Sequence, residues 1–199
     1  MNSLLEPTPQ GKRKFPWADA RAVAAEICRE LKPHCVPERL IVAGSLRRRK
    51  PMVGDVEVLY IPKMVPGIRT DMFAAPALAD CVEARLEYLI EARRTIARRP
   101  NRLGNETWGD KNKLSVHLAS GIPVDFFATT APNWFNYLVC RTGPAELNIR
   151  ISEAAQAKGW KWHPYKSGFT DREGNVIPVT SEREVFEFVN LKYLEPWER

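Results

Sequence analysis

The sequence has no long hydrophobic run, and its cysteines and histidines form no metal or disulfide pattern. No stretch of about 18 consecutive apolar residues occurs, so the sequence predicts no membrane-spanning helix. The N-terminus does not have the pattern of a secretory signal peptide. The four cysteines include no Cys-x-x-Cys pair, and the three histidines have no zinc spacing. Together these absences favour reduced thiols in a cytosolic compartment.

The composition allows a folded core and a modest preference for anionic partners. A chain of 199 residues with 44% hydrophobic residues can form one medium domain, or a domain with a small appendage. The 30 Lys and Arg against 24 Asp and Glu give a net charge of +6. That excess favours a polyanionic partner only weakly, because many soluble proteins carry such a charge without binding nucleic acid.

Residues 42–60 contain the densest group of candidate functional side chains. An apolar run leads into Gly44 and Ser45, a basic segment follows, and a second apolar run carries Asp55 and Glu57. Residues i and i+2 of a strand face the same side, so we expect these two carboxylates to lie side by side. Adjacent carboxylates repel each other unless a cation lies between them. Mg²⁺, which prefers oxygen ligands, is the expected cation.

The start of the same stretch has the features of a phosphate site. Gly44 and Ser45 are expected to open a helix or turn directly after a strand, where backbone N–H groups favour phosphate. Arg47 and Arg48 add positive charge for the same anion. A phosphate site beside paired metal ligands is typical of metal-assisted phosphoryl or nucleotidyl transfer.

A third carboxylate is predicted on a separate strand. Two strands, residues 113–117 and 122–128, are joined by Ser120 and Gly121, and the second contains a single acid, Asp125. Alone, such an acid would be interpreted as a hydrogen-bonded residue of an edge strand. Because paired acids already occur upstream, we interpret Asp125 as the third metal ligand. Pro123 weakens the expected pairing at the start of its strand.

The remaining elements follow from periodicity and from capping residues. The arginines of the second predicted helix are interpreted either as a solvated face or as a phosphate-binding patch. These arginines are Arg85, Arg93, Arg94, Arg98 and Arg99. The expected helices are 17–32, 77–99 and a segment that starts at Thr142-Gly143-Pro144 and stops at Gly159, with a capping box at 181–184 before a last apolar segment. The other expected strands are 39–43, 53–61 and the segments 160–165 and 169–179, which form a small hairpin around 171–175. Residues 1–15 are expected to be a flexible basic tail, and 62–76 a loop.

The pattern Gly-Ser-x-Arg-Arg-x5-Gly-Asp-x-Glu in residues 44–57 resembles the nucleotidyltransferase superfamily and, in this fuller form, the family X DNA polymerases. Asp125 and Thr142-Gly143 stand at the separation found in that family. The ending of the chain, residues 184–196, is also similar to the family's last helix and tail. The resemblance covers the chain from Pro16 to the C-terminus.

The resemblance implies an α+β fold, with a nucleotidyltransferase palm of mixed sheet and flanking helices (16–130) and a small α+β nucleotide- and DNA-binding subdomain (131–199). It implies a DNA polymerase that adds nucleotides to a primer 3′-hydroxyl, filling short gaps in repair with two Mg²⁺ ions, which Mn²⁺ is expected to replace. The expected partners are gapped or template-primer DNA and nucleoside triphosphates, and the protein is expected to be a monomer without membrane contact, in the cytoplasm or at the nucleoid. The implied catalytic and metal residues are Asp55, Glu57 and Asp125; the implied nucleotide-binding residues are Gly44, Ser45, Arg48, Gly54, Thr142, Gly143 and Asn148; Arg47, Cys140 and Arg141 are further candidates.

The sequence departs from the family pattern at four places. Cys140-Arg141 stands where the polymerases usually have Tyr-Phe, which leaves the choice between deoxy- and ribonucleotides open. Ser152 takes the place of an arginine that probes the template, which leaves fidelity open. The second acid is Glu57 where Asp is common. The chain also starts almost at the palm, so we expect no lyase or helix-hairpin-helix domain and a DNA clamp made of basic segments instead.

Two other classes of function remain open on the sequence. One is a template-independent terminal transferase or a small-molecule nucleotidyltransferase, which shares the Gly-Ser and Asp-x-Glu features. The helix after Thr142-Gly143, with Asn148, favours a polymerase over these enzymes. The other is a non-catalytic nucleic-acid-binding remnant, against which the presence of all three carboxylates argues.

Overall fold

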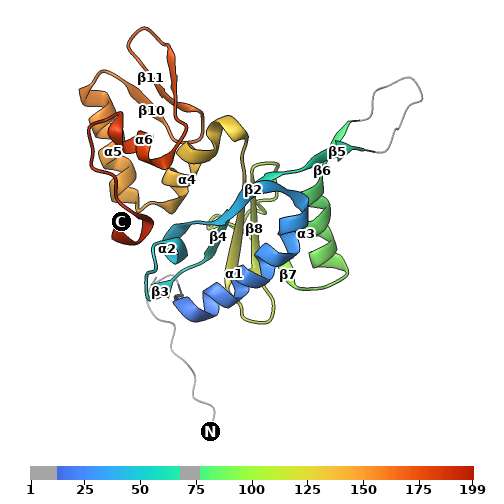
Figure 1. Ribbon diagram of the computed structural model, residues 1–199. Coiled ribbons are helices and arrows are strands. Elements are labelled where there is room, and N and C mark those ends of the chain that lie inside the picture. Colours follow the sequence, from blue (N-terminus) through green and yellow to red (C-terminus); the bar gives the residue numbers. More distant parts are fainter. Residues whose placement is uncertain (1–12, 68–76) are drawn as a thin grey trace.

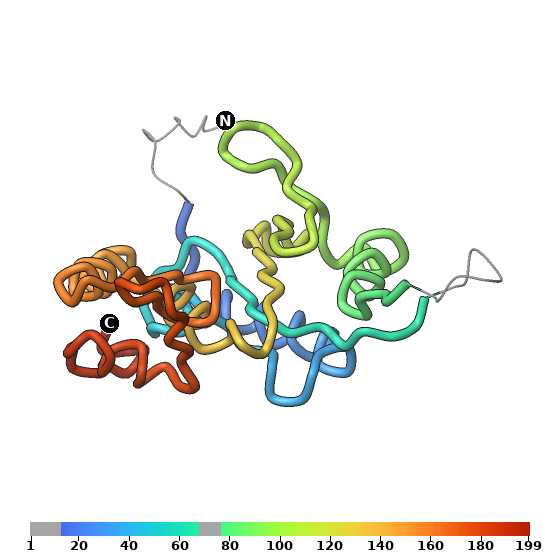
Figure 2. Tube along the Cα trace, turned by 90° about the horizontal axis from the view of Figure 1, so that it is seen from above, coloured from blue at the N-terminus to red at the C-terminus, as the bar shows by residue number. Residues whose placement is uncertain are grey.

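The computed structural model describes residues 13–67 and 77–199. These residues form a sheet unit (13–67 and 77–130) and a smaller C-terminal unit (131–199), which lie side by side (Figure 1). Viewed from above, the C-terminal unit lies at one end of the molecule and the trace of α3 at the other (Figure 2). The sheet unit contains β1 Phe15–Pro16, α1 Trp17–Leu31, η1 Lys32–His34, β2 Cys35–Val42, α2 Gly44–Arg47, β3 Met52–Val53, β4 Val56–Pro62, β5 Met64–Pro66, β6 Leu78–Asp80, α3 Cys81–Glu91, β7 Ile96–Arg98, β8 Asn112–His117 and β9 Pro123–Ala128.

The central sheet has five strands in the order β2-β4-β9-β8-β7. β4 and β9 pair in parallel, and every other neighbouring pair is antiparallel, so the sheet is mixed, as predicted. Alternation along the strands divides the side chains between two faces. Val58 and Phe126 pack with α1 and α3 in the main core. Leu59 and Phe127 point to the opposite face, where they pack against α4.

The C-terminal unit has its own core. This second core contains Val139, Ile151, Phe169 and Phe186, all buried. Pro144 is the N-cap of α5 and Gly159 lies just beyond its end, as the sequence predicted. The elements of the C-terminal unit are η2 Ala131–Asn133, α4 Trp134–Thr142, α5 Ala145–Ala157, β10 Lys161–His163, β11 Gly168–Thr170, β12 Val176–Pro178, α6 Glu182–Glu187 and η3 Pro196–Glu198. The predicted hairpin segments 160–165 and 169–179 contain strands: β10 lies in the first, and the second is divided by the turn 171–175 between β11 and β12.

The predicted helix 77–99 is confirmed in its middle and wrong at both ends. α3 covers only Cys81–Glu91, and it starts where the Asp80 side chain accepts hydrogen bonds from the backbone N–H groups of Val82 (2.7 Å) and Glu83 (3.0 Å). Beyond the helix, Ile96–Arg98 forms the edge strand β7 on β8. The apolar and arginine-rich composition suits a helix, but pairing with a strand that follows in the sequence outweighs that propensity.

Two segments predicted to be irregular contain strands. Part of the predicted loop 62–76 belongs to β5, which pairs with β6, and residues 68–76 lie outside the described residues. Phe15, assigned to the flexible tail, is buried in β1 and pairs with Val53. Residues 1–12 of that tail also lie outside the described residues.

The other predicted elements are confirmed with shifted ends. α1, β8 and β9 match their predicted ranges closely, and β2 is longer than predicted. Pro123 does pair with Val116 at the start of β9. Ser181 caps α6 by accepting a hydrogen bond from the N–H of Glu184. No helix in residues 13–67 or 77–199 is both long enough and apolar enough to cross a membrane.

Candidate active site

The parallel pairing of β4 and β9 brings two of the predicted acids together. Glu57 and Asp125 are direct partners across the two strands, so their side chains leave the same face of the sheet. This is the face that packs against α4, opposite α1 and α3. Asp125 is 8% exposed, a low value for an acid in an apolar strand. The sequence predicts that the two acids meet as metal ligands, but it does not predict that their strands pair in parallel.

Asp55 lies just before β4 rather than inside it. The predicted single strand 53–61 is divided into β3 Met52–Val53 and β4 Val56–Pro62, and Gly54 and Asp55 lie between them. Asp55 and Glu57 are both half-buried. Asp55 thus precedes β4, and Glu57 lies within it as the direct partner of Asp125 on β9.

The turn at Gly44 lies against the second acid. Gly44 has a φ of 62°, and a Cβ added to it would lie 2.0 Å from Oε2 of Glu57. The left-handed conformation and the close contact both require glycine. α2 starts here directly after β2, with Ser45 in its first turn, as the sequence predicted. Because α2 has only four residues, it offers few backbone donors to an anion, and side chains must supply the rest.

Arg47 and Arg48 both reach the C-terminal unit. Nη1 of Arg47 donates to Oγ1 of Thr142 at 2.7 Å, and its Nη2 donates to Oε1 of Glu182 at 2.5 Å. Arg199 completes this network with a 3.0 Å bond to the same glutamate. Arg48 donates to the carbonyl of Thr142. Burial lowers the pKa of Arg48 from its usual value, against the opposing charge of Glu57.

The predicted nucleotide-contacting residues gather where α4 meets α5. Gly143 has a φ of 62°, and an added Cβ would lie 3.1 Å from Nη1 of Arg48. Nδ2 of Asn148 donates to the carbonyl of Cys140 at 2.9 Å. The Oδ1 atom of Asn148 is buried and makes no hydrogen bond within the part of the chain that the structure describes. Thr142, Gly143 and Asn148 are thus brought together, and Arg48 joins them from the sheet unit.

Arg99 is a site residue that the sequence did not identify. Its Nη2 donates to Oδ1 of Asp125 at 2.5 Å, although the two residues lie 26 positions apart. The sequence placed Arg99 on an exposed helix face, whereas it lies just after β7. One signal was present: the apolar residue Ile96 followed shortly by Pro100 is compatible with an edge strand ended by proline.

The guanidinium of Arg141 packs against three aromatic rings and lies near Glu57. Its guanidinium carbon lies 3.6 Å from the ring centre of Phe127 and 5.4 Å from those of Tyr137 and Tyr165. Nη1 of Arg141 lies 3.9 Å from Oε1 of Glu57. The adjacent Cys140 is half-buried, and burial raises the pKa of its thiol, which keeps it neutral. The sequence singled out both positions as departures from the family pattern, and the structure places them at the edge of the site.

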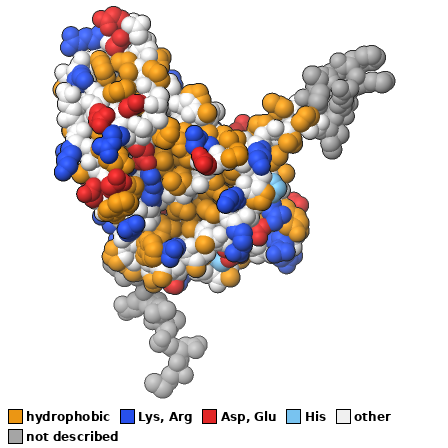
Figure 3. All heavy atoms as spheres, viewed as in Figure 1, with side chains coloured by type: hydrophobic (Ala, Val, Ile, Leu, Met, Phe, Trp, Pro, Cys, Tyr) orange, Lys and Arg blue, Asp and Glu red, His pale blue; other side chains and the backbone are white. Residues whose placement is uncertain are grey.

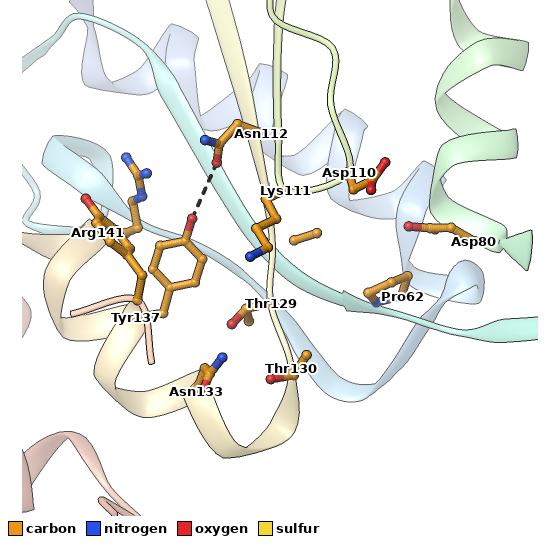
Figure 4. Close-up of a pocket in the computed structure, with 12 residues that line it drawn as sticks. Pro62, Asp80, Asp110, Lys111, Asn112, Thr129, Thr130, Asn133, Tyr137 and Arg141 are labelled. Atoms are coloured by element: carbon orange, nitrogen blue, oxygen red, sulfur yellow. Dashed lines mark hydrogen bonds between the residues drawn. The ribbon is translucent and has the colours of Figure 1, made fainter. Parts of the chain in front are cut away.

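A cavity of about 610 Å³ opens between β4, β9 and α4 (Figure 4). Arg141 and Tyr137 line one side, and the phenol of Tyr137 donates to Oδ1 of Asn112 at 3.4 Å. Asp80 and Asp110 lie on the other side, and Lys111 lies between them and Tyr137 in this view. On the surface seen in Figure 3, Lys and Arg side chains occur on both units with acidic side chains among them. This face therefore has scattered positive charge rather than one continuous basic patch.

The three acids offer oxygen atoms, which is the type of ligand that binds Mg²⁺. Carboxylate oxygens are the ligands that Mg²⁺ prefers, and Gly44 leaves space next to Glu57 that a methyl group would fill. Among residues 13–67 and 77–199, no three His, Cys, Asp or Glu side chains converge closely enough to hold a metal ion as they stand. Guanidinium groups lie next to two of the acids instead, Arg99 at Asp125 and Arg141 at Glu57. Metal binding would therefore require Asp55 and Glu57 to turn toward Asp125, which Arg99 contacts.

Comparison with known proteins bears on the C-terminal unit and on the fold. Residues 137–199 match the family described as DNA polymerase beta thumb. The fold is similar to polymerase beta from Leishmania infantum, in its ternary P/T complex (TM-score 0.69, 18% identity, 94% of this chain and 77% of the other) and in its ternary gap complex (TM-score 0.67, 17% identity, 94% and 71%). No curated protein matches the chain in sequence at a significant level. Residues 137–199 thus match the DNA polymerase beta thumb, and nearly the whole chain has a fold similar to that of polymerase beta.

Proposed function

We propose that the chain is a DNA polymerase that adds nucleotides to a primer 3′-hydroxyl, with short gaps as its preferred substrate. The observation that carries the proposal is the pairing of Glu57 with Asp125 across parallel strands, with Asp55 beside them, on the face next to the thumb. Such a cluster of acids suits metal-assisted transfer of a nucleotidyl group. The similar Leishmania structures are ternary P/T and gap complexes, which supports DNA as the partner here.

In the proposed reaction Asp55, Glu57 and Asp125 would hold two Mg²⁺ ions. Bound Mg²⁺ would make the primer hydroxyl more acidic and would offset the charge of the triphosphate. Asp125 is the candidate acceptor of the hydroxyl proton, because it lies next to Glu57 in a low-exposure part of the sheet. The 3′-oxygen then bonds to the α-phosphorus, the bond to the bridging oxygen breaks, and pyrophosphate leaves with its electron pair.

Different residues are proposed to bind the triphosphate and the nucleoside. Ser45, Arg48 and the backbone at Gly54 are proposed to hold the triphosphate. Arg48 suits this role, because its Nε is buried without a hydrogen-bond partner among the described residues. Asn148 is proposed to contact the nucleoside through its Oδ1, which also has no partner among them. An unsatisfied buried polar atom is costly, so a ligand that pairs with these atoms would be stabilised.

Arg47 is proposed to hold the two units together rather than to bind the nucleotide. Its guanidinium already donates to Thr142 and to both oxygens of Glu182. A group with this many partners has little capacity left for a phosphate. Arg48, its neighbour, is the better candidate for the triphosphate.

Primer extension on three DNA substrates tests the proposal. The substrates are a gapped duplex, a recessed template-primer and a bare single strand, each offered one deoxy- or ribonucleotide at a time with Mg²⁺. Addition of only the template-matched nucleotide, fastest in the gap, is the expected result. Addition to the bare strand regardless of template would indicate a terminal transferase instead. No addition to any substrate would contradict the proposal, and the preferred sugar would show what Cys140 and Arg141 select.

A further inference from the structure

Arg99 lies just after β7, and its side chain reaches Asp125 on β9 across the intervening strand β8. Its backbone N–H donates to the carbonyl of Leu114 at 3.1 Å, just past the end of β7. Leu114 on β8 is the direct partner of Asp125 on β9. Neighbouring strands are about 4.8 Å apart, so the side chain of Arg99 spans the width of β8 to reach Asp125. Only a long side chain can make such a contact.

The guanidinium of Arg99 is fixed at more than one point. Its Nε donates to the carbonyl of Ser115 at 3.0 Å, and its Nη2 donates to Oδ1 of Asp125 at 2.5 Å. Nη1 lies 3.4 Å from the carbonyl of Pro100. Because the arginine fork is planar and rigid, the bond to Ser115 also fixes the direction of the bond to Asp125. A lysine could supply the charge but could not make both bonds with the same geometry.

The preceding residue, Arg98, provides a natural comparison. Arg98 points outward and pairs with Glu87 at 2.7 Å and with Glu106 at 3.0 Å. Its side chain is 38% exposed, against 24% for Arg99 and 12% for Asp125. Exposed pairs of the Arg98 kind contribute little. The two arginines therefore share a segment and a charge, and only one of them touches a proposed metal ligand.

We propose that Arg99 is a positioning residue that holds the Asp125 carboxylate in the orientation required for metal binding and proton transfer. This inference rests on the proposed function. A metal ligand is productive only within a narrow range of orientations, and hydrogen bonds from residues behind it usually set that range. Asp125 points from the middle of a sheet into a site that holds two other acids. Without Arg99, repulsion by those acids would turn its carboxylate away.

A different role for Arg99 predicts the opposite effect on metal binding. If Arg99 served only as a counter-ion for the acids, its removal would make the site more negative and would strengthen metal binding. If Arg99 positions Asp125, its removal weakens metal binding, because a ligand is lost from the productive arrangement. Metal affinity therefore separates the two roles without reference to turnover.

The test uses Arg99→Ala, Arg99→Lys and the matched control Arg98→Ala in the full chain. Mn²⁺ binding is measured by the electron paramagnetic resonance signal of free Mn²⁺, and single-nucleotide incorporation gives kcat and KM. Arg99→Ala should bind Mn²⁺ about 10- to 100-fold more weakly and lose kcat by a similar factor, with little change in the KM for nucleotide. Arg99→Lys should recover only part of both losses, and Arg98→Ala should match the wild type.

Several outcomes would overturn the inference. Unchanged or tighter Mn²⁺ binding by Arg99→Ala would do so, and so would equal losses in Arg98→Ala. Circular dichroism and thermal unfolding show whether Arg99→Ala folds; if it does not, Arg99→Lys, which keeps the charge and the length, carries the test through its Mn²⁺ affinity. Failure of the wild type to bind Mn²⁺ would instead reject the proposed metal site and this inference with it.

Discussion

The two sides of the candidate site are held in place by different kinds of bond. On the sheet side, the backbone hydrogen bonds of β4 and β9 set Glu57 and Asp125 next to each other. On the C-terminal side, α4 and α5 carry the proposed nucleotide-contacting residues, and side-chain bonds from Arg47 and Arg48 connect them to the sheet. The proposed catalytic acids Glu57 and Asp125 are thus positioned by backbone pairing within a sheet, whereas the proposed nucleotide-contacting residues are connected to the sheet through side chains.

The hydrophobic cores also distinguish the two units. The sheet unit and the C-terminal unit have separate cores, and a small cluster at the junction connects them. That cluster includes Leu59 and Phe127 from the sheet and Trp134, Tyr137 and Leu138 from α4. Changes on the sheet side are expected to affect chemistry most. Changes in the arginine bonds are expected to affect the attachment of the C-terminal unit.

The largest loss of nucleotide incorporation is expected from Asp125→Asn. The amide keeps the shape of the side chain but removes the charge that would bind metal and accept a proton, so incorporation should fall by about 10²- to 10⁴-fold. Nucleotide binding should change little, because Arg48 and Asn148 are unaffected. Single-turnover incorporation and a nucleotide titration measure the two quantities. Asp110→Asn, an exposed acid at the edge of the cavity, is the control, and equal losses in both variants would remove Asp125 from the chemistry.

Gly44→Ala should reduce activity by about 10²-fold, the cost of misplacing a reacting group by roughly 1 Å. The new methyl would have to push Glu57 aside, because it would lie 2.0 Å from Oε2. Gly104→Ala is the matched control: Gly104 also has a positive φ, 81°, but nothing lies within 4 Å of its added Cβ. Both variants carry backbone strain of about 1–2 kcal/mol. If both lose the same activity, strain rather than contact with Glu57 explains the loss.

Arg47→Ala should weaken the connection between the two units. It removes charge-assisted bonds to Glu182 and Thr142, which corresponds to about 2–3 kcal/mol in the free energy of unfolding. Arg183→Ala should cost less than about 0.5 kcal/mol, because Arg183 and Glu187 are exposed and 4.0 Å apart. Urea unfolding measures both. A second transition for Arg47→Ala would show that the C-terminal unit unfolds separately, and equal stabilities of the two variants would contradict the role given to Arg47.

Substitution of the residue that caps α6 is expected to change stability modestly and to leave activity unchanged. Ser181→Ala removes the side chain that caps the N–H of Glu184 at 3.2 Å, which should cost about 1 kcal/mol. Ser181→Asp should keep the cap and most of the stability. Thermal unfolding of the two variants compares them. Incorporation by both should equal that of the wild type, since this cap lies away from the acids, and a loss of activity would show that α6 has a closer connection to the site.

The local parts of the site could be predicted from the sequence. Asp55 and Glu57 lie two residues apart, and Gly44 and Ser45 precede them by a short distance, so their relation follows from strand periodicity and turn chemistry. The place of Asp125 in a strand could be predicted because a single acid interrupts an apolar run, and its role as a metal ligand stays a prediction. The α+β fold, with a mixed sheet and flanking helices, was also correctly predicted.

The contacts between distant segments could not be predicted. Arg47 and Glu182 are separated by 135 positions, and no local pattern relates them. Arg99 was misassigned because the segment 77–99 has a helical composition, whereas its last part becomes a strand only by pairing with β8. The contacts of Arg141 depend on the packing of α4 against β9. In each case the partner is set by tertiary structure, which periodicity does not report.

The most direct test of the central claim is single-turnover incorporation into a gapped duplex by the wild-type chain, with Mg²⁺ and then with a chelator. We predict that the template-matched deoxynucleotide is added once in Mg²⁺, that addition stops when the metal is removed, and that Mg²⁺ restores it. Addition that persists in chelator, or no addition with Mg²⁺ present, would contradict the assignment of Asp55, Glu57 and Asp125 as the acids of a metal-dependent polymerase.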